Sequence, residues 1–192
     1  RAAGQGEDAE SLTRIARLVD DDDDRNRLRD AIHTADRATL SAYAQPEALQ
    51  RLPAPTLALL ARALVFRQAR EEALTVYRFA QSKYRDDFIL TIGLARTLLE
   101  FSPTDESMNG DWIFDSRWAP PEDVSPSDVV AARFFSAAVS LGPVCVPARH
   151  ELGFLFGALG EGERAVELFR ESVERERGVA RRWGLLGVAH HR

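Results

Sequence analysis

Two arginines that stand 34 residues apart, Arg62 and Arg96, are the clearest candidates for binding chemistry in this sequence. A guanidinium is a planar fork of N–H donors that holds a carboxylate or a phosphate through two parallel hydrogen bonds. If the chain repeats with this spacing, the two arginines occupy equivalent sites and could together bind one anionic peptide. The alternative is that they pair with Glu71, Glu72 or Glu100 and only solvate the surface.

Catalytic chemistry has no comparable candidates. The sequence contains no glycine-rich phosphate loop, paired-cysteine motif, His-Glu-x-x-His pair or Gly-x-Ser-x-Gly turn. His33 and His150 are solitary, and the adjacent His190 and His191 point to different sides of a helix, so they cannot share a metal ion. We interpret Cys145 as a small buried residue. We therefore expect no enzymatic activity, no cofactor and no metal site.

The amino-acid composition limits which classes of partner and which cellular location fit this chain. The net charge of -5 argues against nucleic acid as the main ligand, because phosphate binding normally shows as a clustered basic excess. A single cysteine cannot form an internal disulfide, which indicates a reducing, cytoplasmic environment; the alternative is a disulfide-free protein outside the cytosol. The apolar runs are shorter than the roughly 20 residues that a membrane span requires. We interpret the five carboxylates at residues 20–24 as a solvated linker that caps the next helix, with a cation site or an acidic docking patch as the alternative.

The elements that must position the arginines are pairs of helices. The same pattern of large and small apolar residues returns after 34 residues: Leu60, Ala61 and Leu64 recur as Leu94, Ala95 and Leu98, and Ala131, Phe135 and Ala138 recur as Ala165, Phe169 and Ser172. This pattern resembles the tetratricopeptide repeat family, whose unit is a pair of antiparallel helices. The resemblance implies an all-α, right-handed α-solenoid with an extended concave binding face.

In that family the first helix of each repeat lines the concave groove. Carried over by register, the groove positions are Ala58 and Arg62, Ile92 and Arg96, His150 and Phe154, and Gly184 and Val188. The Lys and Asn groove residues of the chaperone-tail-binding subfamily are missing at these positions. Two further departures from the family pattern are Gln68, where a turn glycine is preferred, and Arg85, where proline is preferred.

The repeat pattern also predicts the organisation of the chain. Ala73 and Ala131 carry the same signature 58 residues apart, which indicates 24 extra residues within the second repeat. The predicted segments are a leader and short helix at 1–19, an atypical capping helix pair at 20–53, repeats at 54–87, 88–143 (with the insertion at about 102–125) and 144–179, and the first helix of a truncated fourth repeat at 180–192. Within the capping pair we predict helices over 25–34 and 37–49.

The insertion contains three large aromatic residues, Trp112, Phe114 and Trp118. Rings of this size are expected to pack on neighbouring helices, and the alternative is that they contact another protein. The predicted partner-binding residues are therefore Arg62, Arg96, His150, Phe154, Trp112 and Trp118.

These observations predict a non-catalytic scaffold that binds a protein or peptide, acidic or phosphorylated, on its concave face. The stretch from Arg25 to Leu64, with its Arg-x-Arg-Leu-Arg-Asp start, resembles the region C-terminal to the catalytic domain of some bacterial Ser/Thr protein kinases. That resemblance implies a regulatory or targeting region of a larger signalling protein, with a kinase domain upstream of Arg1. The fourth repeat stops after one helix, so we also expect the full protein to continue beyond Arg192. The alternative is a stand-alone adaptor or assembly factor with no attached enzyme.

Overall fold

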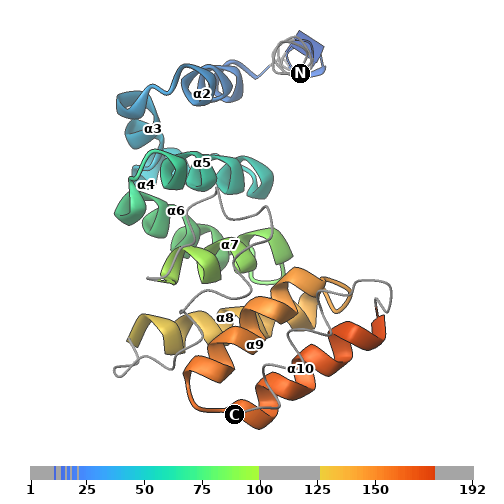
Figure 1. Cartoon of the computed structure of the whole chain (residues 1–192). Helices are drawn as coiled ribbons and strands as arrows, with labels where there is room; N and C mark the ends of the chain where they lie inside the picture. Colours follow the sequence, from blue (N-terminus) through green and yellow to red (C-terminus); the bar gives the residue numbers. More distant parts are fainter. Residues whose placement is uncertain are drawn as a thin grey trace, which may run out of the picture. The chain divides into compact units, whose positions relative to one another are not determined.

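The computed structural model describes residues 11–99, apart from positions 12, 13, 16, 18 and 21, and residues 126–175. Within these ranges every regular element is a helix (Figure 1). The helices are α2 (Asp23–Thr34), α3 (Arg37–Tyr43), α4 (Pro46–Leu49), α5 (Ala54–Phe66), α6 (Arg70–Lys83), α7 (Phe88–Leu98), α8 (Pro126–Leu141), α9 (Val146–Ala158) and α10 (Gly162–Arg175). The chain forms two compact units, residues 1–80 and 81–192.

Aspartate side chains begin three of the helices. The Oδ1 atom of Asp22 accepts a hydrogen bond of 2.8 Å from the backbone N–H of Arg25 at the start of α2, and Asp87 accepts one of 2.9 Å from Leu90 at the start of α7. Asp36 caps α3 in the same way. Each cap satisfies a backbone N–H that has no partner inside its helix.

The core of the first unit is built from α2, α3 and α5, which pack on one another. Its fully buried large side chains are aliphatic: Leu28, Leu40, Leu49, Leu57, Leu60, Leu64 and Val76. The prediction of one helix over 37–49 is wrong, because α3 ends at Tyr43 and α4 begins at Pro46. Gln45 adopts an extended conformation, as expected for a residue that precedes proline.

Two helix ends in equivalent positions of the repeat share one geometry. The backbone N–H of Ala69 donates to the carbonyl of Leu64 at 2.9 Å after α5, and the N–H of Glu161 donates to the carbonyl of Phe156 at 2.7 Å after α9. The residue before each donor has a positive φ, 59° at Gln68 and 78° at Gly160. The turn therefore requires a left-handed residue, which explains why glycine is preferred there.

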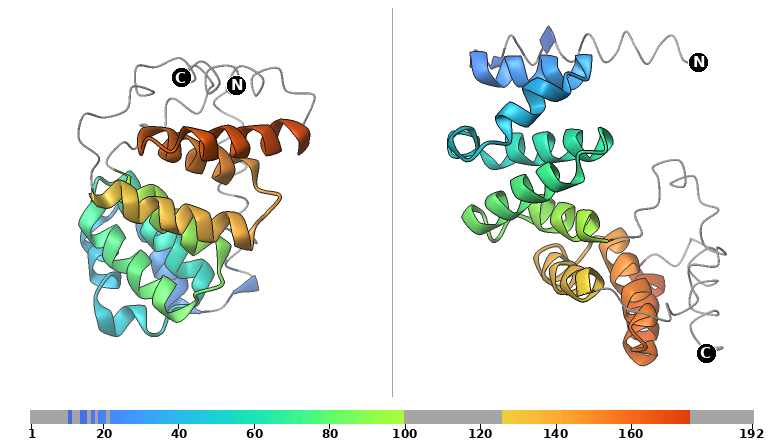
Figure 2. Two further views of the ribbon diagram at one scale, coloured as in Figure 1. Left: turned by 90° about the horizontal axis from the view of Figure 1, so that it is seen from below. Right: turned by 90° about the vertical axis from the view of Figure 1, so that its left-hand side faces the viewer.

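In the second unit, α7 packs on α8, α8 on α9, and α9 on α10; Figures 1 and 2 show α9 and α10 side by side. Phe135 and Phe169 are fully buried in this stack. Gly153 makes room for the ring of Phe169, because a Cβ at position 153 would lie 2.9 Å from two of the ring carbons. The leader at 1–10, the 102–125 insertion and the fourth repeat at 180–192 lie outside the described residues, so those predictions are not tested.

Candidate functional site

Helix α5 has one buried face and one exposed apolar face. Leu57, Leu60 and Leu64 are 0% exposed and fill the core of the first unit. On the rest of the helix, Leu59 is 42% exposed and Phe66 is 53% exposed. The adjacent Val65 is 36% exposed, so three large apolar side chains of a single helix contact solvent. Such a cluster is typical of a surface that another molecule covers.

Arg62 lies on this exposed face. Its guanidinium carbon is 5.6 Å from the centroid of the Phe66 ring, one helical turn further along α5. Among the residues that the structure describes, no carboxylate lies within ion-pairing distance of Arg62, and Glu72 instead faces Arg37 at 3.8 Å. A cation–π contact of this kind uses the charge of the guanidinium and none of its N–H groups as hydrogen-bond donors, so these groups can still bind an incoming anion. We call Leu59, Arg62, Val65 and Phe66 the α5 patch.

Arg96 is in a different situation in the second unit. Its Nη2 atom lies 3.1 Å from Oε1 of Glu151, so an ion pair joins α7 to α9. The Arg96 side chain is 44% exposed and the Glu151 side chain 28% exposed. Burial raises the pKa of Glu151 above its ordinary value of 4.5, and the attraction of Arg96 offsets this effect only in part.

His150 and Phe154, the predicted groove residues of the third repeat, both lie against Phe169 of α10. The ring centroids of Phe154 and Phe169 are 5.3 Å apart in an edge-to-face arrangement, and those of His150 and Phe169 are 6.0 Å apart. Both side chains are only partly exposed. Their rings therefore contribute to the packing of α9 on α10 as well as to the surface.

Beside them, Arg149 is a buried cation that the sequence reasoning did not single out. It is 3% exposed, and its Nε atom donates to Oε2 of Glu171 at 3.0 Å. The Arg149 guanidinium also donates to the backbone carbonyl of Pro143. Because Arg149 joins α9 to Glu171 of α10 and to the segment that precedes α9, its contacts favour a structural role.

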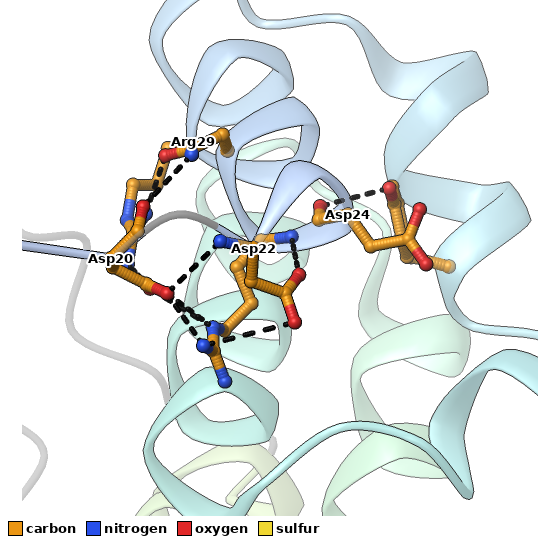
Figure 3. Close-up of polar contacts among 7 residues, drawn as sticks. Asp20, Asp22, Asp24 and Arg29 are labelled. Carbon is orange, nitrogen blue, oxygen red and sulfur yellow. Dashed lines mark hydrogen bonds and ion pairs between the residues drawn. The ribbon is translucent and has the colours of Figure 1, made fainter. Parts of the chain in front are cut away.

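The acidic run at residues 20–24 is engaged in local structure. Both carboxylate oxygens of Asp20 accept from the Arg25 Nε atom, the shorter contact being 2.9 Å, and Arg29 also donates to Asp20. Figure 3 shows these contacts at the start of α2, with Asp20 facing Arg29. Hydrogen bonds from Arg25 and then Arg29 hold the pKa of Asp20 well below its ordinary value. Since Asp22 is the N-cap of α2, the prediction that this run caps the next helix is confirmed. The prediction that the run is a solvated linker is wrong for Asp20, because its carboxylate is paired with two arginines.

Of the predicted site residues, the structure brings His150 and Phe154 together through Phe169. Arg62 belongs to the first unit and Arg96 to the second, so their cooperation at one anion stays a prediction. Trp112 and Trp118 lie outside the described residues. Within the described ranges, no group of three or more His, Cys, Asp or Glu residues is arranged to hold a metal ion, and no helix has the length and apolar character to cross a membrane.

Phe66 and Glu151 were missed by the sequence reasoning. Glu151 immediately precedes Leu152, and the corresponding residue of the first repeat is the exposed Leu59, which precedes Leu60. Extending the predicted register to the residue before Leu60 and Leu152 would have marked Glu151 as the equivalent of the exposed Leu59. Phe66 lies four residues after Arg62, a spacing that brings two side chains together on a helix.

Comparison with known proteins identifies the fold. No protein-family model and no curated protein matches the chain. Among solved structures, a double mutant of MamA RS-1 is 15% identical with a TM-score of 0.63, covering 88% of this chain and 85% of that one. MamA from residue 41 to its end, from Desulfovibrio magneticus RS-1, is 14% identical with a TM-score of 0.60 over 88% and 85%. The first tetratricopeptide repeat domain of Spaghetti (RPAP3), bound to the HSP90 peptide SRMEEVD, is 15% identical with a TM-score of 0.52 over 72% and 90%. These likenesses confirm the predicted all-α fold of tetratricopeptide type.

Proposed function

We propose that this chain is a non-catalytic protein-interaction scaffold and that the α5 patch binds an acidic segment of a partner protein. The observation that carries the proposal is Arg62, which is exposed, lies over the ring of the exposed Phe66, and has no carboxylate partner among the described residues. Arginine and aromatic side chains are the residue types that dominate the energetics of protein interfaces.

The chemistry of the patch specifies the ligand. Leu59, Val65 and Phe66 offer apolar area, so the partner contributes an apolar side chain there. Arg62 offers a bidentate anion site, which suits the carboxylate of Asp or Glu and equally the phosphate of a modified residue. In support, a solved structure of similar fold holds the peptide SRMEEVD, which contains three carboxylate side chains.

The test is selection of peptides from a random library displayed on phage, with the chain immobilised. We expect enrichment of peptides that combine Asp or Glu with an apolar residue. For the selected peptides, Arg62→Gln is expected to weaken binding by about 5- to 30-fold, which corresponds to about 1–2 kcal/mol, and to reduce the salt dependence of affinity.

Arg78→Gln is the matched control, because Arg78 is also exposed and lies in the same unit but on α6. It removes the same charge and is expected to leave binding within about two-fold, as surface charges away from an interface do. Selection of no peptides, or equal losses from the two variants, would overturn the proposal.

We further propose that the scaffold is a regulatory or targeting region of a larger bacterial signalling protein that acts in the cytoplasm. The support is the resemblance of Arg25–Leu64 to the region that follows the catalytic domain in some bacterial Ser/Thr kinases. The competing proposal is a stand-alone adaptor. The gene sequence upstream of Arg1 decides between them, since only the first requires kinase motifs there.

A further inference from the structure

A carboxylate of the protein already occupies Arg96. The partner is Glu151, which comes from α9, whereas Arg96 lies on α7. Arg62 is the residue of the first repeat that corresponds to Arg96. Among the residues that the structure describes, no carboxylate pairs with Arg62. The two arginines that share one register therefore differ in whether an anion is supplied from within the chain.

We infer that Glu151 is a specificity-determining residue, a built-in competitor that excludes external acidic groups from Arg96. The inference rests on the proposed function, because it concerns which arginine an acidic ligand uses. An acidic side chain of a ligand that binds at Arg96 must first displace Glu151. Arg62 requires no such displacement, so it carries most of the affinity for acidic ligands.

The exposures support this competition. The Arg96 side chain is 44% exposed, so a ligand in solution can reach it, whereas the Glu151 side chain is 28% exposed. Displacing Glu151 leaves a partly buried carboxylate without its counter-charge, which is unfavourable. A ligand carboxylate would gain the Arg96 contact and at the same time cause this loss, so the net gain in wild-type protein is small.

Removal of the competitor should therefore convert Arg96 into an anion site. In Glu151→Gln the side chain keeps its size and loses its charge, and Arg96 remains. A partly exposed ion pair contributes up to about 1 kcal/mol, so the variant is expected to bind an acidic probe about three- to five-fold more tightly than wild type. The gain should diminish as salt is added.

The experiment measures binding of a fluorescently labelled hexaglutamate peptide at low ionic strength. The proteins are wild type, Glu151→Gln, the double variant Glu151→Gln/Arg96→Gln, and Glu167→Gln. Glu167 is an exposed residue of α10, so its variant changes the net charge of the protein by the same amount. Circular dichroism checks that each variant is folded.

We expect tighter binding in Glu151→Gln, no gain in Glu167→Gln, and loss of the gain in the double variant. An unchanged affinity in Glu151→Gln, the same gain in Glu167→Gln, or a gain that persists without Arg96 would each overturn the inference.

The outcome is separable from that of the proposed function. If hexaglutamate shows no Arg96-dependent gain while phage-selected peptides still depend on Arg62, the inference fails and the proposed function stands. If no peptide is selected but Glu151→Gln gains Arg96-dependent binding of hexaglutamate, the inference stands and the proposed function fails.

Discussion

The first and third repeats use the same register in different ways. Position 62 of the first repeat corresponds to position 154 of the third, yet Arg62 is displayed on the surface of α5 and Phe154 packs edge-to-face on Phe169. The position before each also differs, since the first repeat has Ala61 and the third has Gly153. Both are buried, and a Cβ at Gly153 would lie 2.9 Å from carbons of the Phe169 ring.

This difference shows that equivalent positions of two repeats can either pack against the next helix or stay exposed to solvent. Where the helix carries glycine, the ring of Phe169 approaches the backbone of α9, and Phe154 packs edge-to-face with that ring. In the first repeat, the guanidinium of Arg62 lies over the exposed Phe66 of its own helix. The proposed partner-binding residues of the first repeat therefore lie where its aromatic side chain is exposed.

The largest effect is expected from Phe169→Ala. Phe169 is 1% exposed, and its removal leaves a cavity between α9 and α10, so we expect a loss of about 3–5 kcal/mol of unfolding free energy. Hydrogen exchange measured by mass spectrometry should show the loss of protection in α9 and α10. Phe169→Leu is the control; because leucine fills part of the space left by the ring, its loss of unfolding free energy should be less than about half of the loss in Phe169→Ala. Equal protection in Phe169→Ala and wild type would mean that this ring does not hold the third repeat together.

The next largest loss of stability is expected from a substitution at Gly153, the small buried residue of the third repeat. Gly153→Ala places a methyl group 2.9 Å from the Phe169 ring and should lower the unfolding free energy by about 1–3 kcal/mol, because the ring must shift. In Gly153→Ala/Phe169→Leu the loss due to the alanine should be smaller, since the ring that clashes is absent. Denaturant titration measures both. Additive losses in the double variant would contradict the close packing of position 153 on this ring.

A smaller change in stability is expected from substitutions at Gln68 and Gly160, the left-handed residues of the turns that follow α5 and α9. Gly160 has a φ of 78°, and no atom lies within 4 Å of the place where its Cβ would be, so Gly160→Gln should destabilise by about 1–2 kcal/mol through backbone strain alone. Gln68→Gly should stabilise by about 0.5–1 kcal/mol, because relief of strain exceeds the added entropy of the unfolded chain. Melting temperatures should move in opposite directions. A shift of the same sign in both variants would show that the two turns are not equivalent.

The smallest effect compares two carboxylates across the pH range. Asp20 has a lowered pKa when folded, so its stabilising contribution is present above its ordinary value of 3.8 and is lost as pH falls through the folded value. Glu151 has a raised pKa when folded, so its contribution is present below its ordinary value of 4.5 and is lost as pH rises through the folded value.

Asp20→Asn should therefore become more destabilising, relative to wild type, between about pH 3 and pH 7, whereas Glu151→Gln should become more favourable over the same range. Chemical denaturation at several pH values measures the two differences. Parallel pH dependences would contradict the opposite environments that the structure assigns to these carboxylates.

The sequence alone was sufficient for the fold class and for the helices of the clear repeats. The spacing of Leu60, Ala61 and Leu64 is local and places one apolar stripe on α5, and its recurrence identifies the repeat type. The break between α3 and α4 was missed, although Pro46 signals it, because the apolar pattern of residues 37–49 continues across the proline.

What the sequence determined about the candidate site is the register, and what only the tertiary structure decided is the environment of each position in it. Periodicity places Arg62 and Arg96 at equivalent positions, since it depends on residues three and four apart on one helix. It does not specify that Glu151 pairs with Arg96 or that Phe169 covers Phe154, because those contacts join different helices. Charge neutralisation and ring packing arise from such contacts between residues far apart in the sequence. Only the packed helices therefore show that Arg62 is exposed without a carboxylate partner among the described residues, whereas Arg96 is paired with Glu151.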